Sequence, residues 1–364
     1  MEKIKLGIIG LGLAWERLHA PAFERLKDRF EIVAVCDTDE NKAREAAVYM
    51  DLPATAVFSD YNKMLARANI EAVDCIVPIR ESFECAAAVI KSGKHLITEK
   101  PLAHTPKAAK ELIQLKNRMK IKMLVAENIR YEEQNIIISN LISDGHIGNV
   151  VYFIDNHVVE YEKQAETGGF AQTEWRQHPH YPGGVLLDSG VHHVARMRFL
   201  FGNILSVAAS GRPTSVGFSP YSCANALFTF HDNIAGHYSF FMAGKETQAP
   251  LVGLRIFGTH GEIFLENREC GFVNVSYRDG RPSGVIPYTP NEGYYHELED
   301  FHTAIRFGGK VESTPEKALG DMETIFNIMN AIKLKQTIRP ETSYEGTPIV
   351  SQMYIPRSAV FVER

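Results

Sequence analysis

Three residues in two separate stretches of the sequence suit the removal of a proton from an alcohol. Lys100 follows the apolar run HLITE, and the carboxyl ends of parallel strands are where doubly wound folds place ligands. Asp188 and His192 stand four residues apart in GGVLLDSGVHH, a helix-like stretch in which both side chains can face the same way. Histidine titrates near neutral pH and can accept the proton, while a lysine charge stabilises the alkoxide that forms. The plainer alternatives are a surface lysine and a core histidine.

The N-terminal stretch KLGIIGLGLAWERLHAP is typical of a dinucleotide-binding turn. Gly10 and Gly12 follow a strand-like apolar run and precede a helical pattern. In such a turn the backbone approaches a pyrophosphate, which the free N–H groups at the helix start bind. We therefore expect Gly10, Gly12, Leu13 and Ala14 to contact the phosphates of a cofactor. A glycine pair is weak support by itself, because many tight turns use one.

The next apolar run, FEIVAVCD, ends in Asp37. A carboxylate at this place hydrogen-bonds the 2′-hydroxyl of a nucleotide ribose, and we expect Asp37 and Thr38 to contact the cofactor. No arginine stands beside Asp37 to pair with a 2′-phosphate, so the sequence favours NAD over NADP. The alternative is that Asp37 caps the helix that follows it.

Trp15 stands where the third glycine of the dinucleotide fingerprint would fall. That glycine lets the helix pack closely on the strand, and an indole cannot occupy the same space. The tryptophan therefore predicts a shifted first turn of the helix, with the indole turned toward the cofactor mouth or the domain cleft.

The elements that must hold these residues are of two kinds. Over roughly the first 125 residues, short runs rich in Ile, Val and Leu alternate with helical patterns, which predicts a parallel sheet covered on both faces. After Asn128 the runs become aromatic-rich and alternate apolar with polar residues, which predicts an antiparallel, half-exposed sheet. A last helix is expected to begin with Thr314 as its cap and Pro315 as its first residue.

These patterns predict an α/β protein with two domains. Residues 1–127 would form an NAD-binding Rossmann domain built on a doubly wound parallel sheet. Residues 128–364 would form an α+β domain with a large, mostly antiparallel open sheet.

Composition narrows the function classes further. The 364 residues are 45% hydrophobic and 23% charged, as in ordinary globular proteins, and the net charge is −5. No basic surface argues for nucleic acid or an anionic membrane, and no apolar stretch approaches the roughly 20 residues of a membrane span. The five cysteines are scattered and never spaced CxxC, so we expect a reduced, cytoplasmic protein.

A metal site is the competing interpretation of the histidines near residue 190. His178, His180, His192 and His193 lie close in sequence, but no nearby cysteine or acidic residue completes a clear zinc set. We therefore expect no metal.

The sequence resembles the Gfo/Idh/MocA oxidoreductases, a family of inositol and sugar dehydrogenases. The resemblance runs over nearly the whole chain, through GIIGLG, EKPLA, AENIRY, EWR, GGVLLDSGVHH and IFGTHGEIFLE. It implies that Lys100, Asp188 and His192 form the catalytic group. In the family's usual scheme the histidine takes the hydroxyl proton while the hydride passes to nicotinamide C4. The lysine hydrogen-bonds the same oxygen or its neighbour, and the aspartate positions the substrate.

The resemblance extends the expected site to further residues. Cofactor contacts are expected from Pro78, Glu99, Lys100, Asn128 and Arg176. Substrate contacts are expected from Lys100, Tyr131, Arg176, His180, Asp188, His192 and His193. For His193 a packing role is an equal alternative, and for Arg176 the alternative is a surface ion pair.

Three departures from the family pattern lie near the expected nicotinamide mouth. Pro182 replaces the first residue of a common triple glycine, and PIRESF follows where the family often has an asparagine and a histidine. His19 sits one position later than the family's histidine, which indicates one inserted residue around Trp15. The substrate is therefore expected to differ from those of the better-known members.

The function predicted is an NAD-dependent dehydrogenase or reductase that acts on a hydroxyl of a sugar, a sugar derivative or a cyclitol. One alternative is a glycosidase that uses bound NAD to oxidise, eliminate and reduce again. Another is a non-catalytic NAD or sugar sensor, which the joint presence of Lys100, Asp188 and His192 argues against. The expected partners are a polyol or sugar and further copies of the chain, as a homodimer or homotetramer, with no nucleic acid or membrane.

Overall fold

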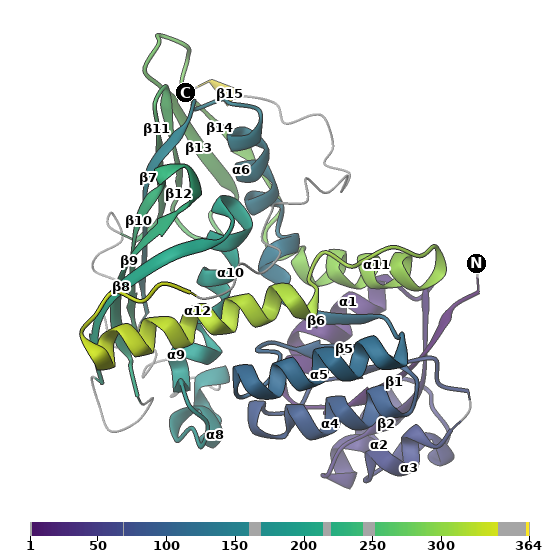
Figure 1. The fold of residues 1–364 in the computed structure, drawn as a ribbon. Coiled ribbons are helices and arrows are strands. Elements are labelled where there is room, and N and C mark those ends of the chain that lie inside the picture. Colours follow the sequence, from purple (N-terminus) through teal and green to yellow (C-terminus); the bar gives the residue numbers. More distant parts are fainter. Residues whose placement is uncertain are drawn as a thin grey trace. The chain divides into compact units, whose positions relative to one another are not determined.

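The computed structural model describes residues 2–67, 69–159, 169–213, 220–242, 252–340 and 362–363 (Figure 1). By its contacts the chain divides into two compact units. One consists of Met1–Asn128 and Tyr294–Leu319, and the other of Ile129–Gly293 and Gly320–Arg364. Each unit holds one sheet, and a C-terminal helix thus joins the N-terminal residues in the first unit.

The first unit contains the predicted doubly wound parallel sheet, which is confirmed. Its strands are β1 (Ile4–Ile9), β2 (Phe30–Cys36), β3 (Val57–Phe58), β4 (Ala72–Cys75), β5 (His95–Glu99) and β6 (Met123–Ala126). Their order is β3-β2-β1-β4-β5-β6, and every pairing is parallel. The strand order reverses between β1 and β4, the place where such sheets bind ligands.

Helices surround this sheet. They are η1 (Trp15–His19), α1 (Ala20–Arg25), α2 (Glu40–Tyr49), η2 (Ala54–Ala56), α3 (Tyr61–Leu65), α4 (Ile79–Lys91), α5 (Pro106–Met119) and α11 (Gly293–Arg306). Most residues of the strands in this sheet are buried, which explains why the strands are largely apolar runs without alternation.

The second unit contains a nine-stranded sheet in the order β15-β14-β13-β12-β11-β7-β10-β9-β8. Its strands are β7 (Val150–Val158), β8 (Ile204–Arg212), β9 (Cys223–Phe230), β10 (Ala235–Phe241), β11 (Gly253–Gly258), β12 (Gly261–Leu265), β13 (Phe272–Tyr277), β14 (Gly284–Pro287) and β15 (Val362–Glu363). Only the β7–β10 pairing among these strands is parallel, so the predicted, mostly antiparallel sheet is confirmed.

Helices α6 and α10 lie on one side of this sheet (Figure 1). The helices of the unit are η3 (Asn128–Tyr131), α6 (Glu133–Ser143), η4 (Phe170–Gln172), α8 (Glu174–Gln177), α9 (Gly184–Asp188), α10 (Gly190–Phe201), η5 (His231–Asn233) and α12 (Pro315–Leu334). Helix α12 begins as predicted, with Thr314 Oγ1 accepting a bond from the Lys317 N–H at 3.2 Å. Strand β9 alternates buried Phe228 with exposed Leu227, so one sheet face is covered and the other is open.

Candidate active site

The glycine turn after β1 has the geometry of a phosphate cradle. Gly10 adopts φ +91°, and a Cβ there would lie 2.1 Å from the Ile76 carbonyl oxygen, so the fold itself requires glycine. At Gly12 a Cβ would meet nothing within 4 Å. Close packing of the turn thus requires glycine at position 10, whereas the absence of a side chain at Gly12 leaves space for a ligand. The N–H groups of Leu13 and Ala14 lie in the first helical turn, where no intrahelical acceptor exists for them. These features fit the phosphates of a dinucleotide.

Asp37 is fixed beside this turn rather than at a helix cap. Its Oδ2 accepts a bond from the Leu11 N–H at 2.8 Å, and its Oδ1 accepts one from the Asp39 N–H at 2.9 Å. Asp39, not Asp37, caps α2, so the capping alternative is wrong. A carboxylate has about four lone-pair sites, so two remain for a ribose. Thr38 beside it is exposed.

The predicted shift at Trp15 is confirmed as a π-helical turn. Residues Trp15–His19 form η1, in which an inserted residue widens one turn of the helix. The orientation of the indole toward the cofactor mouth or the domain cleft stays a prediction. Trp15 is buried, and its ring lies 6.2 Å from that of Phe23 in α1.

The other predicted cofactor residues of the first unit lie at the same sheet edge. Gly10, Asp37 and Lys100 directly follow β1, β2 and β5, and Pro78 and Asn128 come soon after β4 and β6. Because all these strands are parallel, their carboxyl ends meet at one edge. Sequence positions spread over more than a hundred residues are therefore gathered by the topology of the sheet.

At the end of β5, Glu99 and Lys100 are both half-buried. Glu99 Oε2 accepts a bond from the Lys100 N–H at 3.1 Å, and Glu99 Oε1 lies 2.9 Å from His19 Nε2. The Glu99 carboxylate thus joins the first helix to the backbone of the predicted catalytic lysine.

In the second unit, Asp188 is paired with Arg176. Arg176 Nε donates to Asp188 Oδ2 at 2.8 Å, and the two side chains are 16% and 6% exposed. The guanidinium carbon lies 4.0 Å from the centre of the Trp175 ring and 5.4 Å from that of Phe170. The ring contacts and the ion pair both restrain the arginine, so the Asp188 carboxylate is held in one orientation.

Asp188 and His192 do not share one helix, contrary to the sequence-based expectation. Helix α9 ends at Asp188 and α10 begins at Gly190, with Ser189 between them. The spacing of four residues therefore does not by itself put both side chains on one helical face. His192 is half-buried in the first turn of α10.

His193 faces the sheet of its unit. Its Nδ1 lies 2.9 Å from the Tyr238 hydroxyl, and its ring centre lies 3.9 Å from that of His157. Burial lowers the pKa of both histidines, that of His157 to about 3. These contacts support the packing role for His193.

The remaining predicted substrate residues differ in exposure. Tyr131 is fully buried, while His180 is exposed on the segment between α8 and α9. Within the described residues, no hydrogen bond joins His180 to Asp188 or His192. Lys100 belongs to the first unit and His192 to the second, so their joint action stays a prediction.

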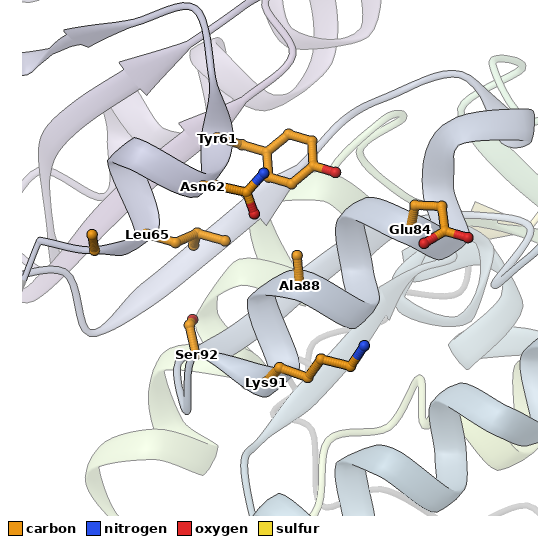
Figure 2. Close-up of a pocket in the computed structure, with 8 residues that line it drawn as sticks. Tyr61, Asn62, Leu65, Glu84, Ala88, Lys91 and Ser92 are labelled. Carbon is orange, nitrogen blue, oxygen red and sulfur yellow. The ribbon is translucent and has the colours of Figure 1, made fainter.

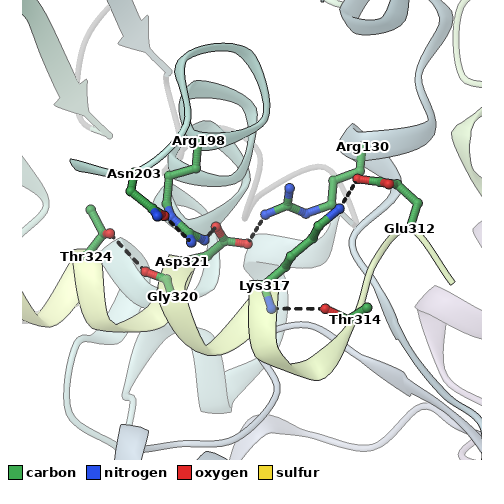
Figure 3. Close-up of polar contacts among 9 residues, drawn as sticks. All are labelled: Arg130, Arg198, Asn203, Glu312, Thr314, Lys317, Gly320, Asp321 and Thr324. Atoms are coloured by element: carbon green, nitrogen blue, oxygen red, sulfur yellow. Dashed lines mark hydrogen bonds and ion pairs between the residues drawn. The ribbon is translucent and has the colours of Figure 1, made fainter. Parts of the chain in front are cut away.

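Sequence reasoning overlooked two sets of buried charged residues. Asp321 of α12 pairs with Arg130 at 2.6 Å and with Arg198, and none of the three is more than 4% exposed (Figure 3). Asp74 and Glu297 are fully buried in the first unit. The signal available for Asp74 was an acidic residue inside the apolar strand AVDC, which only a buried partner can explain.

A separate hollow of about 500 Å³ lies beside α3 and α4 of the first unit (Figure 2). Tyr61, Asn62 and Leu65 line one side, and Ala88 and Lys91 line the other. It includes none of the predicted site residues. The described residues contain no cluster of three or more His, Cys, Asp or Glu side chains that could hold a metal ion. None of the described helices is long and apolar enough to cross a bilayer.

The fold and the glycine turn define a dinucleotide-binding oxidoreductase, and comparison with known families agrees. Residues 4–127 match the "Oxidoreductase family, NAD-binding Rossmann fold" and residues 139–339 match the "Oxidoreductase family, C-terminal alpha/beta domain". The chain belongs to the Gfo/Idh/MocA family of oxidoreductases.

Several known proteins are similar over much of the chain. YMR315W of Saccharomyces cerevisiae is 27% identical over 84% of this chain and 88% of its own length. The 1,5-anhydro-D-fructose reductase of Ensifer adhaerens is 24% identical over 71% of this chain and 76% of its own. The NADP-dependent scyllo-inositol 2-dehydrogenase IolW of Bacillus subtilis is 27% identical over 58% of this chain and 55% of its own.

Solved structures share the fold. An oxidoreductase from Thermotoga maritima is 26% identical with a TM-score of 0.81, over 93% of this chain and 98% of that one. A levoglucosan dehydrogenase in complex with NADH and L-sorbose is 20% identical with a TM-score of 0.81, over 94% of this chain and all of that one.

Proposed function

We propose that this protein is an NAD-dependent oxidoreductase that transfers a hydride between nicotinamide and a hydroxyl-bearing carbon of a sugar, a sugar derivative or a cyclitol. The observation that carries the proposal is the glycine turn after β1, where the space beside Gly12 is open and Asp37 is fixed alongside. Similar proteins that act on inositol, anhydrofructose and levoglucosan support the substrate class.

The preference for NAD rests on the charges near Asp37. A 2′-phosphate at this carboxylate would need a cation to offset repulsion. The next arginine along the chain, Arg44, is paired with Glu40 at 2.6 Å. Because IolW is NADP-dependent by name, both cofactors belong in the test.

The residues of the chain supply acid–base chemistry in this proposal. Nicotinamide, when bound, is the group that accepts or gives the hydride. His192 accepts the hydroxyl proton at an imidazole nitrogen, and the Lys100 ammonium hydrogen-bonds the oxygen and stabilises its developing charge. Asp188, oriented by Arg176, holds the substrate in place.

A panel of sugars, sugar phosphates and inositols with NAD+ and NADP+ tests the proposal through formation of reduced cofactor. We expect turnover with NAD+, and we expect Lys100→Ala and His192→Ala each to lower it by about 10²–10⁴-fold, with NAD affinity nearly unchanged in His192→Ala. Unchanged rates in both variants would refute the assigned roles. Release of an aglycone without net NADH would identify the glycosidase instead, and NAD binding without turnover on any compound would identify a sensor.

We further propose that the first unit is the NAD-binding domain and that the second binds substrate and pairs subunits. Strands β7, β8 and β9 of the second unit's sheet carry the exposed apolar residues Val151, Leu205 and Leu227, which are 53%, 43% and 58% exposed. Light scattering should show a homodimer or homotetramer, and Leu227→Lys should shift it toward the monomer. All five cysteines are free, which supports a reducing, cytoplasmic location.

A further inference from the structure

A buried histidine in the first unit is held between two carboxylates. His19 Nδ1 lies 2.8 Å from Asp74 Oδ2, and His19 Nε2 lies 2.9 Å from Glu99 Oε1. The His19 side chain is 1% exposed, that of Asp74 0% and that of Glu99 15%. All three residues belong to the first unit, and Asp74 and Glu99 come from the neighbouring parallel strands β4 and β5.

Two such contacts require two protons. A neutral imidazole carries one N–H, so it can donate to only one carboxylate, and the opposite nitrogen would then face another lone pair. Both short contacts are attractive only if the imidazole is doubly protonated or a carboxyl carries the second proton. Burial opposes charge on His19, but Asp74 and Glu99 outweigh it and raise the pKa of His19 well above its usual value.

The surroundings of His19 are acidic and closed. Asp74 of β4 and Glu99 of β5 contact the imidazole, the Tyr294 ring of α11 lies 5.7 Å from it, and Glu297 of α11 interacts with it electrostatically. Burial raises the pKa of the fully buried Glu297 well above its usual value, and neither of its carboxyl oxygens accepts a hydrogen bond in the described part of the chain. The carboxylates in hydrogen-bond distance of the imidazole are thus those of Asp74 and Glu99.

The bridge leads to the predicted catalytic lysine. Glu99 uses Oε1 toward His19 and Oε2 to accept the Lys100 N–H. Rotation of this carboxylate would break one contact or the other, so His19 restrains the backbone from which the Lys100 side chain extends. The π turn Trp15–His19 ends on the histidine. The wider turn accommodates the extra residue before His19, so that the imidazole still reaches Asp74 of β4 and Glu99 of β5.

We propose that His19 is a positioning residue, an imidazolium that bridges Asp74 and Glu99 and thereby orients Lys100 for the transfer chemistry. The effect of His19 on catalysis rests on the proposed function. Its structural content, the bridge and the orientation of Lys100, can be measured without turnover.

The test compares His19→Gln with His302→Gln in the full-length protein. Glutamine at position 19 can donate to one carboxylate but turns an oxygen toward the other. His302 is a matched control, because it is also buried in the first unit (1% exposed) but packs on Phe30 without an ion pair to a carboxylate among the described residues. Asp74→Asn is a second variant that keeps the shape and removes one charge, in case the glutamine variant does not fold.

Two readouts are independent of activity. In ¹⁵N-histidine NMR spectra, His19 should remain doubly protonated well above the pH at which an ordinary histidine loses its second proton, and in Asp74→Asn it should lose that proton at lower pH than in the wild type. Acylation of Lys100, followed by peptide mass spectrometry, should change in rate by about threefold or more in His19→Gln, since the rate depends on how exposed the amine is and on what surrounds it. His302→Gln should leave it unchanged.

The kinetic readout is a split between kcat and KM. His19→Gln should lower kcat by about 10- to 100-fold, as expected for a misplacement of about 1 Å, with little change in KM for NAD. A neutral His19 at pH 7, or a Lys100 labelling rate unaffected in His19→Gln and Asp74→Asn, would overturn the inference. If the wild type turns over no compound while both structural readouts behave as expected, the proposed function fails and the bridge stands.

Discussion

Replacing each glycine of the first turn with alanine should have opposite effects on folding and on cofactor binding. At Gly10 the added Cβ would lie 2.1 Å from the Ile76 carbonyl oxygen, and the backbone has φ +91°. The left-handed conformation costs about 1–2 kcal/mol for an L-residue, and relief of the overlap requires β1 and β4 to shift. We therefore expect Gly10→Ala to lower the free energy of unfolding by about 3 kcal/mol or more.

Gly12→Ala should leave the fold intact. Its Cβ would meet nothing within 4 Å, and its φ does not lie in the left-handed region. Loss of freedom in the unfolded chain should stabilise the variant by about 0.4–1 kcal/mol. The same methyl group would stand in the space where the cofactor phosphates approach, so NADH affinity should fall about tenfold or more.

Thermal unfolding and calorimetric titration with NADH together test this reasoning. A loss of about 3 kcal/mol corresponds to roughly 6–12 °C in Tm for a domain of about 150–250 residues. The Tm of Gly10→Ala is therefore expected to be lower than that of the wild type by this amount, and the Tm of Gly12→Ala to be equal to it or slightly higher. Wild-type NADH affinity in Gly12→Ala would show that the open space beside Gly12 is not the phosphate site. Wild-type stability in Gly10→Ala would show that the turn is not held as described.

Three further predictions concern the second unit. Asp321→Ala should cost about 3–5 kcal/mol in unfolding free energy, measured by urea denaturation, because it leaves two buried arginines without their carboxylate; a loss below about 1 kcal/mol would contradict this. Arg176→Ala should lower kcat by about 10- to 100-fold, because Asp188 loses the ion pair that orients it. Arg176→Lys should be impaired as well, since a lysine lacks the planar guanidinium. A kcat equal to that of the wild type in both variants would refute this role of Arg176. The folded-state pKa of His157 is depressed to about 3, so the unfolded state binds an extra proton between roughly pH 6.5 and 3. The free energy of unfolding should therefore decrease as the pH is lowered through that window. His157→Phe should flatten this dependence in thermal melts, and an unchanged slope would show that His157 is not buried in its neutral form.

Local sequence patterns were sufficient for the fold class. The glycine spacing after β1, the apolar runs of β1 to β6 and the Thr314–Pro315 start of α12 each predict an element that the structure contains. They are predictable because a buried parallel strand must be apolar on both faces and a helix start must satisfy its own N–H groups. Even the misfit Trp15 correctly indicated an irregular first turn.

The sequence predicted which residues could carry chemistry, and the tertiary structure decided how they are held. Periodicity suggested that Asp188 and His192 share a helical face, but a break at Ser189 and the ion pair to Arg176 set the orientation of Asp188 instead. His19, Asp74 and Glu99 are separated by up to 80 residues and contribute to the site only because parallel strands β4 and β5 bring them within hydrogen-bond distance. Spacing along the chain reports only local geometry, whereas the energy of a buried charge depends on partners that folding brings from distant parts of the chain.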